Sequence, residues 1–229
     1  MSLKNLNYDN SIDLNKLGSK YGTDKVDINH SYKGITYLDI YHRYMGASRL
    51  GVKTFIEIGV CGGQSLKMWK EYFPNATIYG IDIDPSCRQH AEERIEIIIG
   101  DQNDDNFLKS LAEKFKDSID ILLDDGSHIT KHQIKTYSYL YPCIKSGGLF
   151  IIEDLANSYE EWVNDINLRD IWPGMIYNKP NDELKNYRED FNTFINSVVK
   201  KLDLNKINKH DTHMVSIHFY PMIVIFENC

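Results

Sequence analysis

From Thr54 onward, short apolar runs alternate with segments whose apolar residues recur at helical spacing. This alternation is typical of βαβ units that build a parallel sheet. The predicted strands are Thr54–Ile58, Thr77–Ile81, Ile95–Ile99, Ile119–Leu123 and Gly148–Ile152. The predicted helices between them are Ser65–Tyr72, Cys87–Glu93, Asp105–Phe115 and His132–Ile144.

Two further β-rich runs, Val215–Phe219 and Met222–Phe226, lie near the C-terminus. They are too close in sequence for a crossover helix, so we expect an antiparallel hairpin. Five βα units followed by an antiparallel pair differ from the usual dinucleotide-binding sheet. This arrangement resembles that of the class I methyltransferases, and the resemblance implies an α/β, Rossmann-like fold with a parallel sheet and a C-terminal antiparallel hairpin strand.

The segments outside this pattern suggest the domain organisation. Residues 1–50 carry a helical patch with Gly18 as its expected stop, and an aromatic helix in which Tyr37, Leu38, Tyr41 and Tyr44 form a packing face. We expect 1–50 to be an N-terminal helical cap and 51–229 to be the main domain. A polar, weakly periodic stretch predicts a lid at about 157–188, and an apolar helical stripe follows it. The stripe consists of Phe191, Phe194, Ile195, Val198, Val199 and Leu202.

Composition narrows the classes of function. The chain has 229 residues, 42% of them hydrophobic, enough for one sizeable α/β domain. A net charge of −7 without a dense Lys/Arg run argues against nucleic-acid binding and favours a small-molecule substrate. The four cysteines are far apart and indicate neither a zinc knuckle nor a disulfide framework. With no apolar run of membrane-spanning length and a polar start, a cytoplasmic protein is expected.

A candidate cofactor site follows the first three strands. In Glu57-Ile58-Gly59-Val60-Cys61-Gly62-Gly63-Gln64-Ser65, glycines let the backbone approach a ligand, and Ser65 opens a helix whose free N–H groups suit a carboxylate. Cys61 replaces the middle glycine of the dinucleotide fingerprint, so no pyrophosphate is expected there. Asp82 ends the second strand, where a ribose diol could bind, and Asp101-Gln102 follow the third and suit an adenine edge. Each of these residues taken alone could be a helix cap or a turn residue, but three of them follow three consecutive strands. Adenosine recognition without pyrophosphate indicates S-adenosylmethionine.

A candidate metal site follows strands four and five. Asp124-Asp125-Gly126-Ser127-His128 and Glu153-Asp154 would converge at the carboxyl edge of the sheet. Three carboxylates at Asp125, Glu153 and Asp154 repel one another unless a cation neutralises them, and oxygen ligands suit Mg²⁺. The alternative is that these residues cap helices or face solvent. Asp124 is ambiguous, since it could contact the cofactor or the loop.

His128 lies three residues beyond Asp125 and is the candidate general base. A neutral imidazole accepts a proton at physiological pH, but a sugar hydroxyl needs a metal to lower its pKa first. The alternative is a structural histidine bonded to backbone; His132 and His30 have weaker claims.

Together these segments resemble the metal-dependent sugar O-methyltransferases typified by the mycinamicin methyltransferases and related to cephalosporin-hydroxylase-like proteins. The resemblance covers roughly Lys20 to Asp154, through Lys20-Tyr21-Gly22-Thr23-Asp24-Lys25 and the motifs above. It implies that Asp125, Glu153 and Asp154 hold Mg²⁺, that Asp125 and His128 are catalytic, and that the turn containing Thr23 closes over the cofactor. The cofactor contacts expected are Thr23, Glu57, Gly59, Gly63, Ser65, Asp82, Asp101, Gln102 and Asp124.

The acceptor stays open at this point. An Asn-, Lys- and Ile-rich composition, associated with A+T-rich bacterial genomes, favours a nucleotide-activated sugar for a capsule or surface polysaccharide. The alternatives are an antibiotic sugar, a catechol-type phenol, or a non-catalytic cofactor-binding module. Oligomeric state is also open, with a homo-oligomer among the outcomes.

Overall fold

The computed structural model describes residues 12–26, 33–155, 187–208 and 214–229. Residue contacts divide the chain into two compact units, Met1–Gly100 and Asp101–Cys229. The lid expected at 157–188 lies outside the described residues except for its last two, and His30 lies outside them too. The domain boundary expected at residue 50 stays a prediction.

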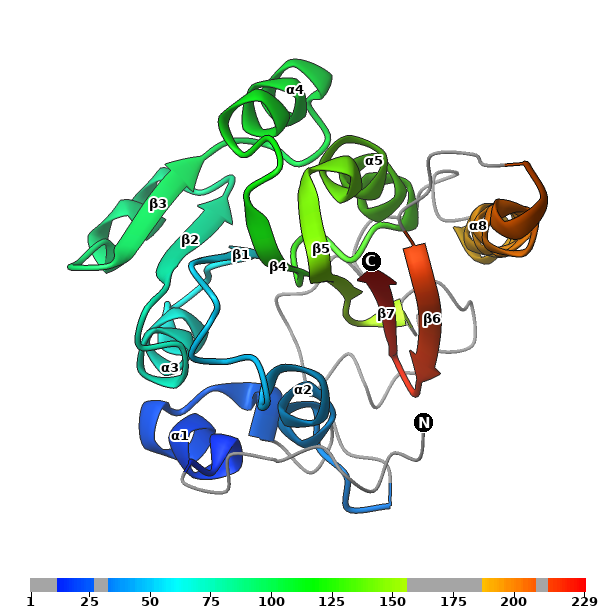
Figure 1. Cartoon of the computed structure of the whole chain (residues 1–229). Coiled ribbons are helices and arrows are strands. Elements are labelled where there is room, and N and C mark those ends of the chain that lie inside the picture. Colours follow the sequence, from blue (N-terminus) through cyan, green and yellow to red (C-terminus); the bar gives the residue numbers. More distant parts are fainter. Residues whose placement is uncertain (1–11, 27–32, 156–186, 209–213) are drawn as a thin grey trace, which may run out of the picture. The chain divides into compact units, whose positions relative to one another are not determined.

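The first unit contains three parallel strands in the order β3-β2-β1 (Figure 1). They are β1 (Thr54–Ile58), β2 (Thr77–Asp82) and β3 (Ile95–Ile99). Ile58 pairs with Ile81, and Asp82 pairs with Ile99, so all three strands end at one edge. The segments that follow them therefore start side by side, as the sequence predicted.

The helices of the first unit are α1 (Leu14–Tyr21), α2 (Tyr37–Met45) and α3 (Gln64–Tyr72), with 3₁₀ turns at Asp24–Val26 and Pro85–His90. A capping box between Thr36 and Asp39 opens α2. The predicted packing face of α2 is confirmed for Tyr37, Leu38 and Tyr41, which are buried. Aromatic rings dominate the core beside β1. They are Tyr41, Phe55, Trp69, Tyr72 and Phe73.

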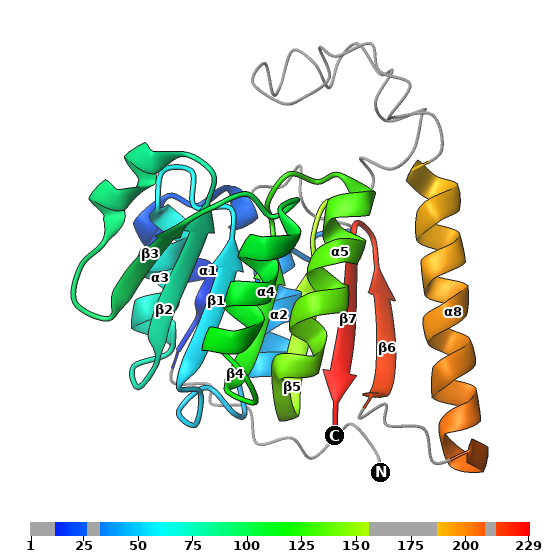
Figure 2. The same ribbon diagram turned by 90° about the horizontal axis from the view of Figure 1, so that it is seen from above.

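The second unit has four strands in the order β4-β5-β7-β6. They are β4 (Ile119–Asp124), β5 (Ile144–Ile152), β6 (Met214–Tyr220) and β7 (Ile223–Asn228). β4 and β5 are parallel, whereas β7 is antiparallel to both β5 and β6, which confirms the C-terminal hairpin. The helices are α4 (Asp105–Lys114), α5 (Thr130–Leu140) and α8 (Tyr187–Asn208), and Figure 2 shows α8 alongside β6.

Several predicted element boundaries are wrong. β5 starts at Ile144 and not at Gly148, and α5 starts at Thr130 and not at His132. Gly18 does not end α1, which continues to Tyr21 and closes on Gly22 at φ 72°. Residues 87–93 form no α-helix, because Asp84 and Pro85 start a 3₁₀ helix that ends at His90. The helix predicted to reach Ile144 ends at Leu140, because a 3₁₀ turn containing Pro142 follows it and Ile144 opens β5.

Candidate active site

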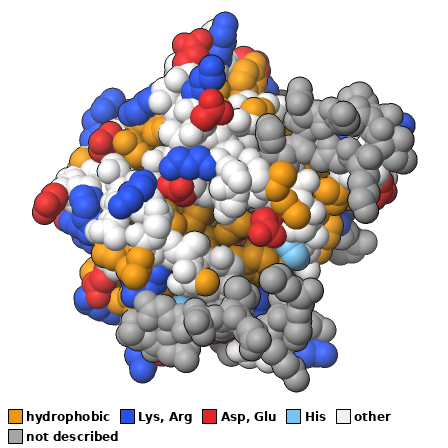
Figure 3. All heavy atoms as spheres, viewed as in Figure 1, with side chains coloured by type: hydrophobic (Ala, Val, Ile, Leu, Met, Phe, Trp, Pro, Cys, Tyr) orange, Lys and Arg blue, Asp and Glu red, His pale blue; other side chains and the backbone are white. Residues whose placement is uncertain are grey.

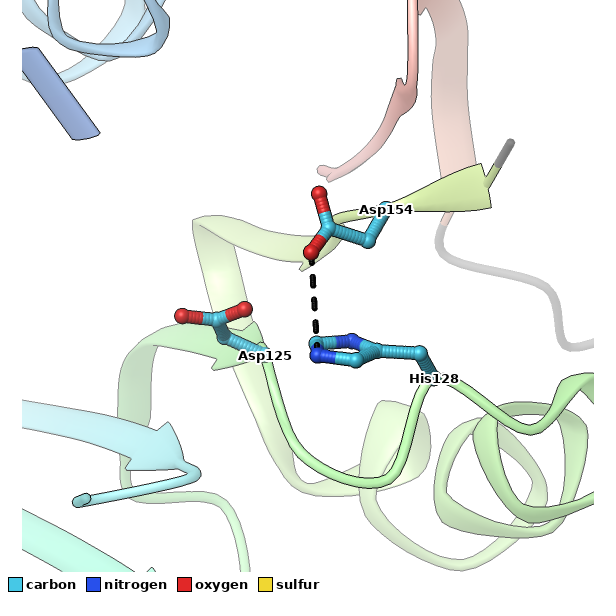
Figure 4. Close-up of side chains that lie close together, drawn as sticks. All are labelled: Asp125, His128 and Asp154. Atoms are coloured by element: carbon cyan, nitrogen blue, oxygen red, sulfur yellow. Dashed lines mark ion pairs between the residues drawn. The ribbon is translucent and has the colours of Figure 1, made fainter. Parts of the chain in front are cut away.

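Asp125, His128 and Asp154 lie together in the second unit. Each offers one potential metal-ligand atom, and these three atoms lie within 4.8 Å of one another. Figure 4 shows Asp125 and His128 on the loop after β4 and Asp154 just beyond β5. All three side chains are partly or largely buried. The sequence predicted that these two acidic segments would converge, and for Asp125 and Asp154 they do.

The register of β4 and β5 brings them together. Asp124 pairs with Ile152 at the ends of the two strands, and the Glu153 N–H donates to the Asp124 carbonyl at 3.0 Å. Beyond that pair, the Leu155 N–H donates to the carbonyl of Met222 in the β6–β7 turn. Asp154 is thus held between two backbone hydrogen bonds, one on either side of it.

Both loops carry an unusual backbone at the site. His128 has φ 55° and Asp154 has φ 59°, in the left-handed region that non-glycine residues seldom adopt. Such conformations persist only where the surroundings enforce them, and they concentrate at functional sites. Here they aim the imidazole and the carboxylate at each other, with His128 Nε2 3.6 Å from Asp154 Oδ2 (Figure 4).

The His128 ring is largely enclosed, its side chain being 17% exposed. Its Nδ1 atom is buried and has no hydrogen-bond partner among the described residues. The ring is therefore not fixed by a backbone hydrogen bond there, which weakens the alternative of a purely structural histidine.

Gln102 organises the loop that carries Asp125 and His128. Its Nε2 donates to both carboxylate oxygens of Asp124 at 3.2 and 3.3 Å, and its Oε1 accepts from the Ser127 N–H at 2.7 Å. Burial raises the pKa of Asp124 to about 6, against the lowering effect of the Gln102 amide and the Gly126 N–H. Both polar ends of Gln102 are thus used inside this unit, although the sequence assigned Gln102 and Asp124 to the cofactor.

Glu153 is 2% exposed and is not a member of the three-residue cluster. Its carbonyl accepts from Gln133 Nε2 at 3.1 Å. Its predicted role as a metal ligand stays a prediction. His132, the weaker histidine candidate, has its Nδ1 2.9 Å from the Ser127 hydroxyl. Sequence reasoning missed Gln133, since nothing in a helical stretch marks one glutamine as a loop support.

In the first unit, the glycine-containing turn has the shape predicted for a close backbone approach. Gly59, Cys61 and Gly63 have φ 94°, 46° and 73°. The Asp82 carboxylate fixes this turn, because its Oδ2 accepts from the N–H groups of Val60 and Cys61 at 2.8 and 3.2 Å. Asp82 therefore shapes the turn, in addition to its predicted role as a ribose ligand.

Glu57 is fully buried in β1 and contacts Ser65, another predicted cofactor residue, and Lys25. The Ser65 hydroxyl donates to its Oε2 at 2.7 Å, and the Lys25 ammonium lies 3.8 Å from its Oε1. Lys25 is 2% exposed, and its backbone N–H reaches the hydroxyl of the buried Thr23 at 3.5 Å. The buried Lys25–Glu57 ion pair was not foreseen, because a lysine in a polar turn is exposed by default.

The remaining predicted residue, Asp101, closes a turn of the second unit. Its Oδ1 accepts from the Asn103 N–H at 2.7 Å, and Asp104 then caps α4. This is the turn-and-cap arrangement that short polar residues favour after a strand.

The fold is that of a class I methyltransferase domain. Residues 56–155 match the family described as a methyltransferase domain. That segment runs from β1 to the residue after Asp154, so it includes the glycine turn and the acidic cluster.

The similar proteins bear out the finer resemblance to sugar O-methyltransferases. The chain is 37% identical over 170 residues to mycinamicin VI 2''-O-methyltransferase of Micromonospora griseorubida, covering 71% of this chain and 38% of that protein. It is 32% identical to demethylmacrocin O-methyltransferase of Streptomyces fradiae, covering 94% of this chain and 53% of the relative. The chain thus spans about 38 to 53% of the length of these curated relatives.

Solved structures agree with the fold. The MycE methyltransferase of the mycinamycin pathway, in complex with Mg, SAH and mycinamycin VI, aligns with a TM-score of 0.69 and 31% identity over 95% of this chain and 54% of that one. A putative caffeoyl-CoA O-methyltransferase from Staphylococcus aureus has a TM-score of 0.56, and at 14% identity it supports the fold alone.

Two surface findings complete the description. On the face shown in Figure 3, acidic and basic side chains are interspersed, without a continuous basic area among the coloured residues. A phosphate backbone is attracted by concentrated positive charge, which this face lacks. Among the helices that the structure describes, none has the length and apolarity to cross a bilayer.

Proposed function

We propose that this protein is an S-adenosylmethionine- and Mg²⁺-dependent O-methyltransferase that acts on a sugar hydroxyl. The observation that carries the proposal is the cluster of Asp125, His128 and Asp154 at the end of two strands of a class I methyltransferase fold. The named relatives are themselves O-methyltransferases, and the MycE structure contains Mg and SAH.

The donor set fits a hard divalent ion. Asp125 and Asp154 offer carboxylate oxygens, which are the protein ligands that Mg²⁺ prefers. Glu153, next in the chain, is proposed as the third. When bound, the ion would lower the pKa of a sugar hydroxyl. An imidazole is a poorer ligand for Mg²⁺ than for softer metals, so we assign His128 to the proton instead.

The enclosed His128 ring suits a general base. Its Nε2 edge faces the acidic cluster, where it can accept the hydroxyl proton, and Asp154 stabilises the imidazolium that forms. The surrounding structure, which enforces the unusual backbone at both residues, holds the two groups in this orientation before substrate arrives. Asp125 would bind the metal ion that activates the acceptor hydroxyl.

Cofactor contacts are proposed for residues of each unit. In the first unit these are Thr23, Glu57, Gly59, Gly63, Ser65 and Asp82. In the second they are Asp101, Gln102 and Asp124, of which Gln102 and Asp124 also hold the catalytic loop.

For the acceptor, the relatives favour a sugar attached to an antibiotic. Their names include the mycinamicin VI enzyme and a rhamnosyl tetracenomycin-C 2'-O-methyltransferase of Streptomyces olivaceus, 39% identical over 150 residues. The capsule-type nucleotide sugar, expected from composition, has no support among these relatives. We therefore propose a glycoside hydroxyl as the acceptor.

The experiment is a methyl-transfer assay with S-adenosylmethionine, comparing mycinamicin VI and a rhamnosyl tetracenomycin with nucleotide sugars and catechol. We expect methylation of a glycoside that stops with EDTA and returns with Mg²⁺. Methyl transfer that is unaffected by EDTA would contradict the proposed metal role. Methylation of catechol alone would contradict the proposal that the acceptor is a sugar. Tight cofactor binding without turnover on any hydroxyl would instead favour a non-catalytic module.

His128→Asn removes the proposed base without disturbing the backbone, because asparagine tolerates the positive φ at this position and cannot act as a base. We expect turnover to fall about 100-fold or more while cofactor affinity is kept. His218→Asn, at a histidine on β6 bonded to Ser216, is the matched control and should leave turnover unchanged.

A further inference from the structure

The direction of the His128 imidazole depends on the backbone of its loop. The buried Nδ1 atom of the ring has no hydrogen-bond partner among the described residues. The Nε2 atom is 3.6 Å from Asp154 Oδ2, which is longer than a hydrogen bond (Figure 4). His128 also has a left-handed backbone, at φ 55°, which its surroundings must enforce. The residues that flank His128 therefore decide where the ring points.

His132, the third residue of α5, forms hydrogen bonds with both residues that flank His128. Its Nδ1 atom lies 2.9 Å from the hydroxyl oxygen of Ser127, the residue before His128. Its backbone N–H donates to the carbonyl of Ile129, the residue after His128, at 2.9 Å. The two flanking residues are also joined to each other, because the Ile129 N–H donates to the Ser127 hydroxyl at 3.3 Å. These three hydrogen bonds enclose the backbone of His128.

Ser127 is held from a second direction by Gln102. The Ser127 N–H donates to Gln102 Oε1 at 2.7 Å, and the Gln102 amide is itself bonded to the buried Asp124 carboxylate. The backbone of Ser127 is thus fixed by Gln102, and its side chain is fixed by His132. Ser127 cannot rotate without breaking one of these bonds, so the peptide that leads into His128 keeps its direction.

We propose that His132 is a positioning residue, which holds His128 through Ser127 in the orientation that accepts the proton of the acceptor hydroxyl. The inference rests on the function proposed above, in which His128 is the general base. His132 is not one of the three residues of the acidic cluster, and its effect on the reaction is indirect. Misplacing a reacting group by about 1 Å can lower turnover about 100-fold, so a support beside the base has a measurable effect.

The test compares variants that remove or keep the side-chain bond. His132→Leu and Ser127→Ala remove it, whereas His132→Asn keeps it, because the asparagine amide lies close to the position of Nδ1 and can donate or accept. In the methyl-transfer assay we expect His132→Leu to lower kcat about ten-fold while leaving the affinity for S-adenosylhomocysteine unchanged. We expect His132→Asn to retain most of the parent kcat.

A second readout does not require methyl transfer. Diethyl pyrocarbonate reacts with accessible neutral imidazoles, and peptide mapping gives its rate of reaction at His128, whose side chain is 17% exposed. Loss of one hydrogen bond in the support should raise this rate about five-fold in His132→Leu and in Ser127→Ala. His132→Asn should react at His128 as the parent does. If the parent shows no methyl transfer, the function proposed above fails, and the rate at His128 still decides whether His132 positions the ring.

His218→Leu is the matched control, because it removes another histidine of the same unit whose ring lies 2.8 Å from a serine hydroxyl, that of Ser216. It should change neither readout. The double variant Ser127→Ala/His132→Leu should be no more impaired than Ser127→Ala alone, because both changes remove the same bond. Parent-like reactivity of His128 in His132→Leu, equal impairment by His132→Asn and His132→Leu, or additive effects in the double variant would each overturn the proposal.

Discussion

His128 Nε2 lies 3.6 Å from Asp154 Oδ2, and each of the two residues has a left-handed backbone. Two strained residues from separate loops meeting in this way indicate a site that the fold enforces, since a surface pair would relax.

We expect Asp154→Asn to weaken Mn²⁺ binding, measured by electron paramagnetic resonance, by about ten-fold or more, because it removes a charged oxygen ligand. Asparagine tolerates the backbone at this position, so folding should be kept. Asp120→Asn, which alters a carboxylate paired with Lys145 on the same sheet, should bind Mn²⁺ like the parent. Equal weakening by both changes would point to a general charge effect.

Gln102→Leu should lower the free energy of unfolding by about 1–3 kcal/mol, since it leaves the buried Asp124 carboxylate and the Ser127 N–H without their partner. Urea denaturation measures this change. Asn103→Ala is the neighbouring control, because the hydrogen bonds recorded for Asn103 involve its backbone. A Gln102 variant as stable as the control would show that the loop carrying Asp125 and His128 does not depend on Gln102 for its stability.

Gly63→Ala combines two penalties, a positive φ of 73° and a new methyl group against the His90 ring. Gly147 has a similar φ of 76° but open space around it, so Gly147→Ala isolates the backbone strain. We expect a loss of about 1 kcal/mol at Gly147 and about 1–3 kcal/mol more at Gly63, by thermal unfolding. Equal losses would mean that His90 moves aside freely.

The Lys20 ammonium and the Tyr21 hydroxyl both donate to Glu71, and they lower the pKa of its carboxyl, Lys20 having the larger effect. A depressed pKa stabilises the fold above the ordinary glutamate pKa of about 4.5, and that contribution is lost as pH falls below it. Glu71→Gln should therefore reduce stability at pH 7 and make little difference at pH 3. Since the groups are exposed, the effect is under about 1 kcal/mol. A pH-independent difference in urea unfolding would contradict this, and the exposed Glu93→Gln serves as control.

Cysteine reactivity should separate by exposure. Cys61 and Cys229 are exposed, whereas Cys87 and Cys143 are buried, and burial raises the pKa of the Cys87 thiol to about 11. At pH 8 we expect Cys61 and Cys229 to react with Ellman's reagent about 100-fold or more faster than Cys87, because the thiolate is the reacting form. Peptide mapping after alkylation identifies the sites. Fast labelling of Cys87 would mean that its 3₁₀ helix opens readily.

Strand positions were predictable because each is a short apolar run between polar breaks. The bounds of β1 and β3 match the prediction at both ends. The start of α5 was not predictable from the sequence, because its N-cap residue, Ile129, makes no side-chain capping hydrogen bond. The 3₁₀ helix at Pro85 carries the Asp-Pro start of an α-helix but stops after two turns.

The site was predictable where strand order alone decides proximity. Asp125 and Asp154 follow adjacent parallel strands, so their meeting follows from topology. The partners of Gln102 and Lys25 were not predictable, because each contact depends on which way one side chain turns and on a residue more than twenty positions away. Packing decides which buried polar side chains pair with one another, and these partners cannot be predicted from a single sequence.

The engagement of Asp82 has a consequence for redesign of this protein. An acidic residue at this strand end is an obvious target for anyone seeking to change which nucleoside-containing cofactor is accepted. Here the same carboxylate also clamps the N–H groups of Val60 and Cys61, so its replacement would loosen the turn before it altered selectivity. A redesign would first have to provide another hydrogen-bond acceptor for the N–H groups of Val60 and Cys61, and only then change the residue at position 82.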